Sequence, residues 1–287
     1  MSAGGSGLNV AVVVNASSSN SVQLGNYYCE RRQVPAQNLL RILWPGGNTE
    51  WSKADFETLL ATPLAQMLTA RGLTGQVDTV VLSMDIPYRV AHVVDATASG
   101  KNSTTSALFY GFKPDTTPPP GVPGSCSLPP DSANAYAGSE NVFRQVAAPA
   151  ATSNFLAFMI TATNLATAEA IVDRGVASDG TFPPQKAFLT KSTDYDRNVR
   201  YLAFDNAILD NAVLGRVTLV RTNTNDPQSQ GTQLGSLTGA YGFGVSKYSF
   251  LPGAMADNLT SYGGVLFEND YGMTRLRSFA ATKPSSS

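Results

Sequence analysis

Charged side chains and histidine are scarce in this sequence. Of its 287 residues, 14% are charged, and the net charge is −1; an average soluble domain is about 25% charged. This balance argues against a nucleic-acid partner, because no run of Lys and Arg is present to neutralise a phosphate backbone. The single histidine and the two cysteines exclude a poly-histidine metal site and a four-cysteine zinc site. We therefore expect no metal and no other cofactor.

Long apolar runs are also absent. A membrane span needs about 18 apolar residues, whereas runs such as Phe155–Ile160 have the length of a core strand. Residues 1–7 lack the basic and apolar regions of a signal peptide and are interpreted as a flexible leader, with residues 281–287 as a polar tail. A neutral surface rich in Ser, Thr, Asn, Gln and Gly is typical of exported bacterial proteins. We therefore expect a secreted or periplasmic protein without a membrane span.

Short apolar runs alternate with amphipathic segments, which predicts parallel strands joined by helices. Ser52 and Asp55 form a capping-box pattern at the start of one such helix. Residues 113–130 are rich in proline and can form neither a helix nor a central strand. The sequence therefore predicts one α/β domain over residues 8–280, with a doubly wound, mostly parallel, three-layer sheet of Rossmann-like type and a Pro-rich insertion. The strands are expected at residues 8–14, 38–43, 78–84, 155–161, 186–190 and 216–221.

Ligands of doubly wound folds bind beyond the carboxyl ends of the strands. Polar side chains follow the first and third predicted strands at Asn15, Ser17, Asp85, Tyr88, Arg89, His92 and Asp95. An aspartate near a histidine can orient it as a general base, so Asp85, Arg89 and His92 are the candidate catalytic residues and the others are candidate binding residues. The alternative is that Asp85 caps a turn and Arg89 pairs with a neighbouring carboxylate.

The glycine-rich segment 239–264 is a second candidate region. Asp257, Asn258 and Ser261 are expected there on one short turn, which either lines a cleft or closes the sheet edge as a hydrogen-bonded loop. The sequence contains no phosphate loop, no complete dinucleotide fingerprint and no Gly-x-Ser-x-Gly elbow. Cys29 and Cys126 are poor nucleophile candidates, and whether they form one disulfide depends on geometry.

Three stretches, Val12–Asn38, Val80–Arg89 and Leu251–Gly264, resemble motifs of an uncharacterised family of exported bacterial proteins. Their layout is also distantly similar to that of caspase-like and gingipain-like cysteine peptidases, which place a His and a Cys after successive strands. The resemblance implies such an α/β fold. It does not extend to the Cys–His mechanism, because Asn258 stands where the family has histidine and a valine follows His92 where the peptidases have glycine.

These observations predict an exported hydrolase-like protein with a cleft at the strand ends. The alternatives are a non-catalytic extracellular binding protein and a structural or assembly subunit. The expected partner is a small molecule, a glycan or a peptide of unknown identity, and an oligomer remains an open alternative.

Overall fold

The computed structural model describes residues 7–91, 101–112, 155–214, 217–223, 230–266, 271 and 273–274. The chain divides into two compact units, residues 5–161 and residues 162–287, and each is described by itself. The sequence analysis assigned both parts to one domain. Several predictions from the sequence lie outside the described residues, namely the leader 1–7 except for its last residue, the Pro-rich insertion 113–130, the tail 281–287, His92, Asp95 and Cys126.

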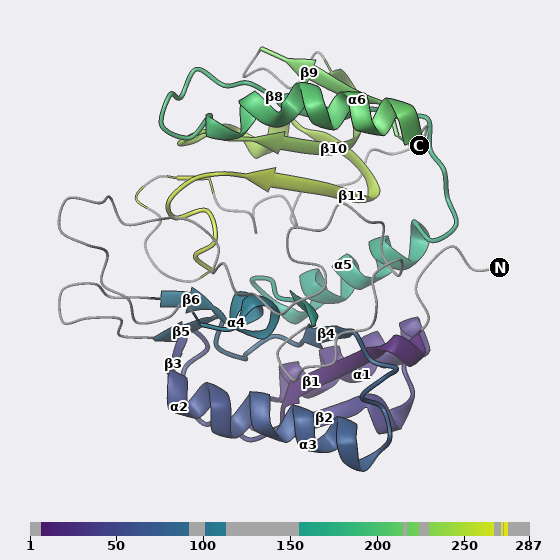
Figure 1. The fold of residues 1–287 in the computed structure, drawn as a ribbon, viewed down its shortest axis with the longest axis vertical. Helices are drawn as coiled ribbons and strands as arrows, with labels where there is room; N and C mark the ends of the chain where they lie inside the picture. Colours follow the sequence, from purple (N-terminus) through teal and green to yellow (C-terminus); the bar gives the residue numbers. More distant parts are fainter. Residues whose placement is uncertain are drawn as a thin grey trace. The chain divides into compact units, whose positions relative to one another are not determined.

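The first unit contains a four-stranded parallel sheet in the order β2-β1-β4-β7, of which β1, β2 and β4 are labelled in Figure 1. Its strands are β1 (Val10–Asn15), β2 (Leu39–Ile42), β4 (Thr79–Leu82) and β7 (Leu156–Met159). The side chains from Ala11 to Val14 are fully buried, as expected for a parallel strand that is covered on both faces. The chain places β2 on one side of β1 and β4 on the other, so the winding reverses between β1 and β4.

Helices cover both faces of this sheet. On one face, Val12, Val14 and Val81 pack against side chains of α1 (Ser19–Arg32). The opposite face packs against a helical run made of α2 (Lys53–Asp55), the π-helical η3 (Phe56–Ala61) and α3 (Thr62–Ala70), and against α4 (Thr104–Tyr110). The unit is therefore a three-layer α/β structure with a mostly parallel sheet, as the sequence predicted.

The helix starts show how local sequence sets these elements. The expected capping box is confirmed: the Ser52 hydroxyl accepts from the Asp55 N–H, and the Asp55 carboxylate accepts from the Ser52 N–H. Asn164 caps α5 (Leu165–Ala177), where its side-chain oxygen accepts from the Thr167 N–H at 2.9 Å. A three-stranded sheet of β3 (Glu50–Ser52), β5 (Arg89–Ala91) and β6 (Lys101–Ser103) was not predicted. Strands of three residues are too short to display a hydrophobic period.

The second unit contains another four-stranded parallel sheet, in the order β11-β10-β8-β9. Its strands are β8 (Ala187–Thr190), β9 (Leu219–Thr222), β10 (Thr232–Thr238) and β11 (Ser249–Asn258). The helix α5 packs against β11, and α6 (Phe204–Leu214) packs against β9 (Figure 1). Both units therefore have the mostly parallel, helix-flanked construction expected from the sequence.

The segment from Phe250 to Asn258 corrects the sequence analysis. The expected short turn bearing Asp257 and Asn258 is wrong, because these residues end the long strand β11. A register shift against β10 and the left-handed backbone of Gly253, with φ of 77°, interrupt the regular alternation of side chains. A strand with such a bulge lacks the period of two that identifies strands in a sequence.

Candidate functional site

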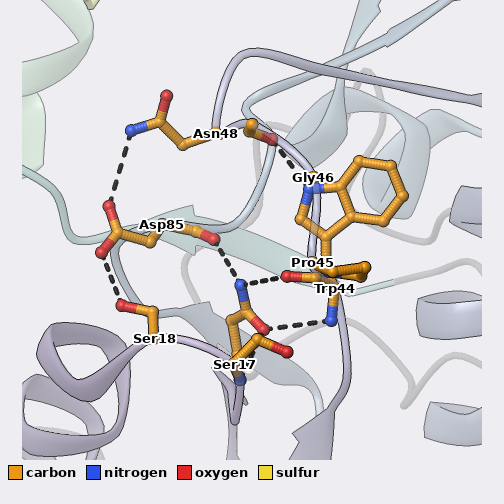
Figure 2. Close-up of a pocket in the computed structure, with 9 residues that line it drawn as sticks. Ser17, Ser18, Trp44, Pro45, Gly46, Asn48 and Asp85 are labelled. Atoms are coloured by element: carbon orange, nitrogen blue, oxygen red, sulfur yellow. Dashed lines mark hydrogen bonds between the residues drawn. The ribbon is translucent and has the colours of Figure 1, made fainter.

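A pocket of about 320 Å³ lies in the first unit at the carboxyl ends of β1, β2 and β4 (Figure 2). It is bounded by three chain segments, which supply Asn15, Ser17, Ser18, Trp44, Pro45, Gly46, Gly47, Asn48 and Asp85. The winding of the sheet reverses between β1 and β4. Doubly wound sheets bind their ligands at this switch point, so the fold and the pocket indicate the same place.

Asn15 ties the three segments together. Its side-chain oxygen accepts from the N–H groups of Trp44 and Ser17, both at 3.1 Å. Its side-chain nitrogen donates to the carbonyl oxygens of Trp44, at 3.0 Å, and Asp85, at 2.9 Å. These four bonds satisfy the amide fully, and only 3% of the residue is exposed. Asn15 lines the pocket as predicted, but its polar side-chain atoms bind protein backbone.

Asp85 carries the only ionisable side chain among the nine pocket-lining residues. Its backbone is left-handed, with φ of 59°, a conformation that aspartate tolerates better than most residues. The Ser18 hydroxyl donates to Asp85 Oδ2 at 2.6 Å, and the Asn48 amide lies 3.5 Å from Oδ1 (Figure 2). The hydrogen-bond partners of this carboxylate among the described residues are thus neutral.

Ser18 connects Asp85 to the start of α1. Its Oγ accepts from the Ser21 N–H at 3.1 Å as the N-cap of α1. Because the same hydroxyl donates to Asp85, the direction of its proton is fixed. The N-terminal end of α1 therefore lies at the pocket and contributes a partial positive charge.

The loop 44–48 forms the remaining wall. The Trp44 indole N–H donates to the Gly47 carbonyl at 2.8 Å, and the indole meets Trp51 edge to face with ring centroids 5.8 Å apart. A Cβ at Gly46 would lie 2.4 Å from a carbon of the Trp44 ring, so a larger residue cannot fit there without a shift. The sequence analysis missed this loop, although it follows the second predicted strand and the carboxyl-end rule applies to it equally.

Tyr88 and Arg89 do not line this pocket. Arg89 lies on β5, where its Nε is 2.7 Å from Glu50 Oε2 and its guanidinium lies over the Tyr88 ring. This ion pair is the arrangement that the alternative interpretation of Arg89 expected. His92 lies outside the described residues, so of the three candidate catalytic residues the structure places only Asp85 in the pocket.

The predicted binding residues Asp257, Asn258 and Ser261 belong to the second unit. The Asn258 side chain accepts from the Ala240 N–H at 3.0 Å and donates to the Ala240 carbonyl at 3.1 Å. This is the pairing that Asn15 makes with Trp44, again at the end of a strand. Asp257 forms an ion pair with Arg200, and Ser261 is exposed in the following turn.

A second pocket, of about 440 Å³, lies in this unit over β8, β10 and β11. It is mostly apolar and is lined by Ala187, Phe188, Leu189, Val217, Leu234, Gly235, Ser236, Leu237, Gly253, Met255, Ala256 and Asp257. The polar side chains in this lining are those of Ser236 and Asp257, and Asp257 is already paired with Arg200, whereas most small-molecule sites have several polar groups that converge on the ligand. The first pocket is therefore the better candidate site.

Within the described residues, no three His, Cys, Asp or Glu side chains are grouped so that they could hold a metal ion. None of the helices in that part of the chain has the length and hydropathy needed to cross a bilayer. No protein-family model, curated protein or solved structure matches this chain. The resemblance to the family of exported bacterial proteins therefore stays a prediction.

Proposed function

We propose that the pocket at the ends of β1, β2 and β4 binds a small polar molecule, which donates hydrogen bonds to Asp85. The supporting observation is the placement of one carboxylate at the switch point of a doubly wound sheet. Each carboxylate oxygen has two lone pairs, and each Asp85 oxygen receives one donor from Ser18 or Asn48. Among the described residues no other donor binds these oxygens, so their remaining lone pairs are available to a ligand.

A second candidate function is hydrolysis, with Asp85 as the general base. The contact that favours it is the 2.6 Å hydrogen bond from the Ser18 hydroxyl, because the carboxylate already accepts an O–H group at this position. A water molecule held in the same way would lose its proton to Asp85 as it attacks the substrate. An exported location, as the composition predicts, is part of both proposals.

Asp85→Asn tests the binding function because it removes the charge and keeps the side-chain volume. We would screen wild-type protein by thermal shift against sugars, amines, amino acids and short peptides, and measure the affinity of each hit by calorimetry. We expect Asp85→Asn to weaken binding at least about tenfold, or about 1.4 kcal/mol. Glu30→Gln removes an exposed carboxylate from α1 and is the matched control. Unchanged affinity in Asp85→Asn would refute the proposal.

Hydrolysis is tested separately with ester, peptide and glycoside substrates. A positioned general base accelerates a reaction by about 10²–10⁴-fold, so turnover should fall by that factor in Asp85→Asn and stay unchanged in Glu30→Gln. Turnover that survives in Asp85→Asn would exclude this role for Asp85. Ligand binding without turnover would leave the binding function alone.

A further inference from the structure

We infer that the ligand of this pocket is a cation and that an organic ammonium group of the ligand pairs with Asp85. This inference rests on the proposed binding function and specifies the class of ligand. It follows from the charge of the pocket, from its supply of hydrogen-bond acceptors and from its one aromatic wall.

The charge of the pocket comes first. The nine lining residues in the part of the chain that the structure describes include one carboxylate and no Lys, Arg or His. The hydrogen-bond partners of Asp85, Ser18 and Asn48, are neutral. The N-terminus of α1 offsets at most about half an elementary charge, so the pocket stays negative. A phosphate or carboxylate ligand would meet a like charge there, whereas an ammonium group would meet an opposite one.

The hydrogen-bond acceptors of the pocket also favour a ligand that carries an ammonium group. An ammonium group has three N–H donors and no acceptor. Asp85 Oδ1 is only loosely engaged, because its contact with the Asn48 amide is 3.5 Å long. Asn48 and Ser17, which also line the pocket, carry neutral side-chain oxygens. The pocket therefore offers one strong acceptor, the Asp85 carboxylate, to the N–H donors of an ammonium group.

The Trp44 indole is the third element. Indole is the best of the aromatic rings at attracting a cation over its face. The bond from its N–H to Gly47 and the edge-to-face contact with Trp51 fix the ring as part of the pocket wall. A neutral polyol would gain contact area from this ring, but a cation gains electrostatic attraction as well.

Two pairs of probes test the inference by calorimetry on the full chain: putrescine against butanediol, and glucosamine against glucose. Neutral hydroxyls replace the ammonium groups within each pair, two in the first pair and one in the second. We expect the amine to bind at least about tenfold more tightly and this preference to disappear in Asp85→Asn but not in Glu30→Gln. Amine binding to wild-type protein should also weaken as salt is raised, since salt screens the attraction; this measurement does not depend on how the variant folds.

The possible failures are distinguishable. If the neutral probes bind as tightly as the amines and still depend on Asp85, the charge inference is overturned and the proposed binding function stands. Amine binding that ignores both salt and Asp85→Asn also overturns the inference. If no probe binds, and the wider screen yields no ligand either, the proposed function itself is refuted together with the inference.

Discussion

Replacement of Asn15 by alanine should loosen the pocket and destabilise the first unit. The substitution removes four hydrogen bonds at once, two to Trp44 and one each to Ser17 and Asp85. A typical intramolecular hydrogen bond contributes about 1 kcal/mol net. Trp44 and Asp85 are only half-buried, so water can replace part of what is lost. We therefore expect the free energy of unfolding to fall by about 2–4 kcal/mol.

The loss is measured by urea unfolding followed by circular dichroism, and located by amide hydrogen exchange. The Trp44 and Ser17 N–H groups lose their acceptor in Asn15→Ala, so their exchange should accelerate more than that of the amides in the centre of β1. Asn20→Ala is the control, because Asn20 is an exposed asparagine in the first turn of α1. It should change stability by less than about 0.5 kcal/mol.

A third variant, Asn15→Asp, separates the donor bonds from the acceptor bonds. It retains an oxygen for the N–H groups of Trp44 and Ser17 but places a second oxygen about 3 Å from two carbonyl oxygens. We expect it to be no more stable than Asn15→Ala. A loss below about 1 kcal/mol in Asn15→Ala, or wild-type stability in Asn15→Asp, would refute the role given to this side chain.

Two other predictions concern α1. Gly25→Ala would place a Cβ 2.1 Å from Val14 Cγ1, so we expect a loss of about 1–3 kcal/mol in urea unfolding, which outweighs the better helix propensity of alanine; equal or higher stability would contradict the tight packing of α1 on β1. Burial raises the pKa of Cys29 from 9.0 to about 11, against a smaller opposite effect of Arg41. The unfolded thiol therefore loses its proton first, and the contribution of Cys29 to stability should decline between pH 9 and about 11. This is checked by comparing wild type with Cys29→Ala across that range; a stability difference that does not change with pH would contradict it.

The fold could be predicted from the sequence where local pattern and tertiary packing agree. β1 is an uninterrupted apolar run, and Ser52 and Asn164 are local caps, so each was visible without knowledge of distant residues. β11 could not be predicted from the sequence, because its proline, its glycine and its bulge interrupt the period of two that identifies a strand. The division of the strands between two sheets is a property of long-range pairing and has no local signal.

The residues of the candidate site could likewise be predicted where a local pattern marks them, but their long-range contacts could not. Asn15, Ser17 and Asp85 were found because they directly follow apolar runs, which the carboxyl-end rule uses. Three of the four hydrogen bonds of the Asn15 amide are made with residues 29 and 70 positions away. The ion pair that holds Arg89 spans 39 positions. Such pairings depend on how the sheet is assembled. The sequence could therefore identify these residues as candidates, but it could not show whether their polar groups bind a ligand or other parts of the protein.

The edge-to-face pair of Trp44 and Trp51 gives this protein a built-in optical probe. These are the only two tryptophans of the chain, and both lie in the first unit, one of them in the pocket wall. Intrinsic fluorescence excited at the red edge of the absorption band, where tyrosine does not absorb, therefore reads the first unit alone. A ligand beside Trp44 would change the tryptophan emission without any label. The second unit holds six of the chain's eleven tyrosines and no tryptophan, so melting of the sheet formed by β8 to β11 changes the tyrosine signal and not the tryptophan signal. Comparison of the two signals in a single titration would show whether the two units unfold together.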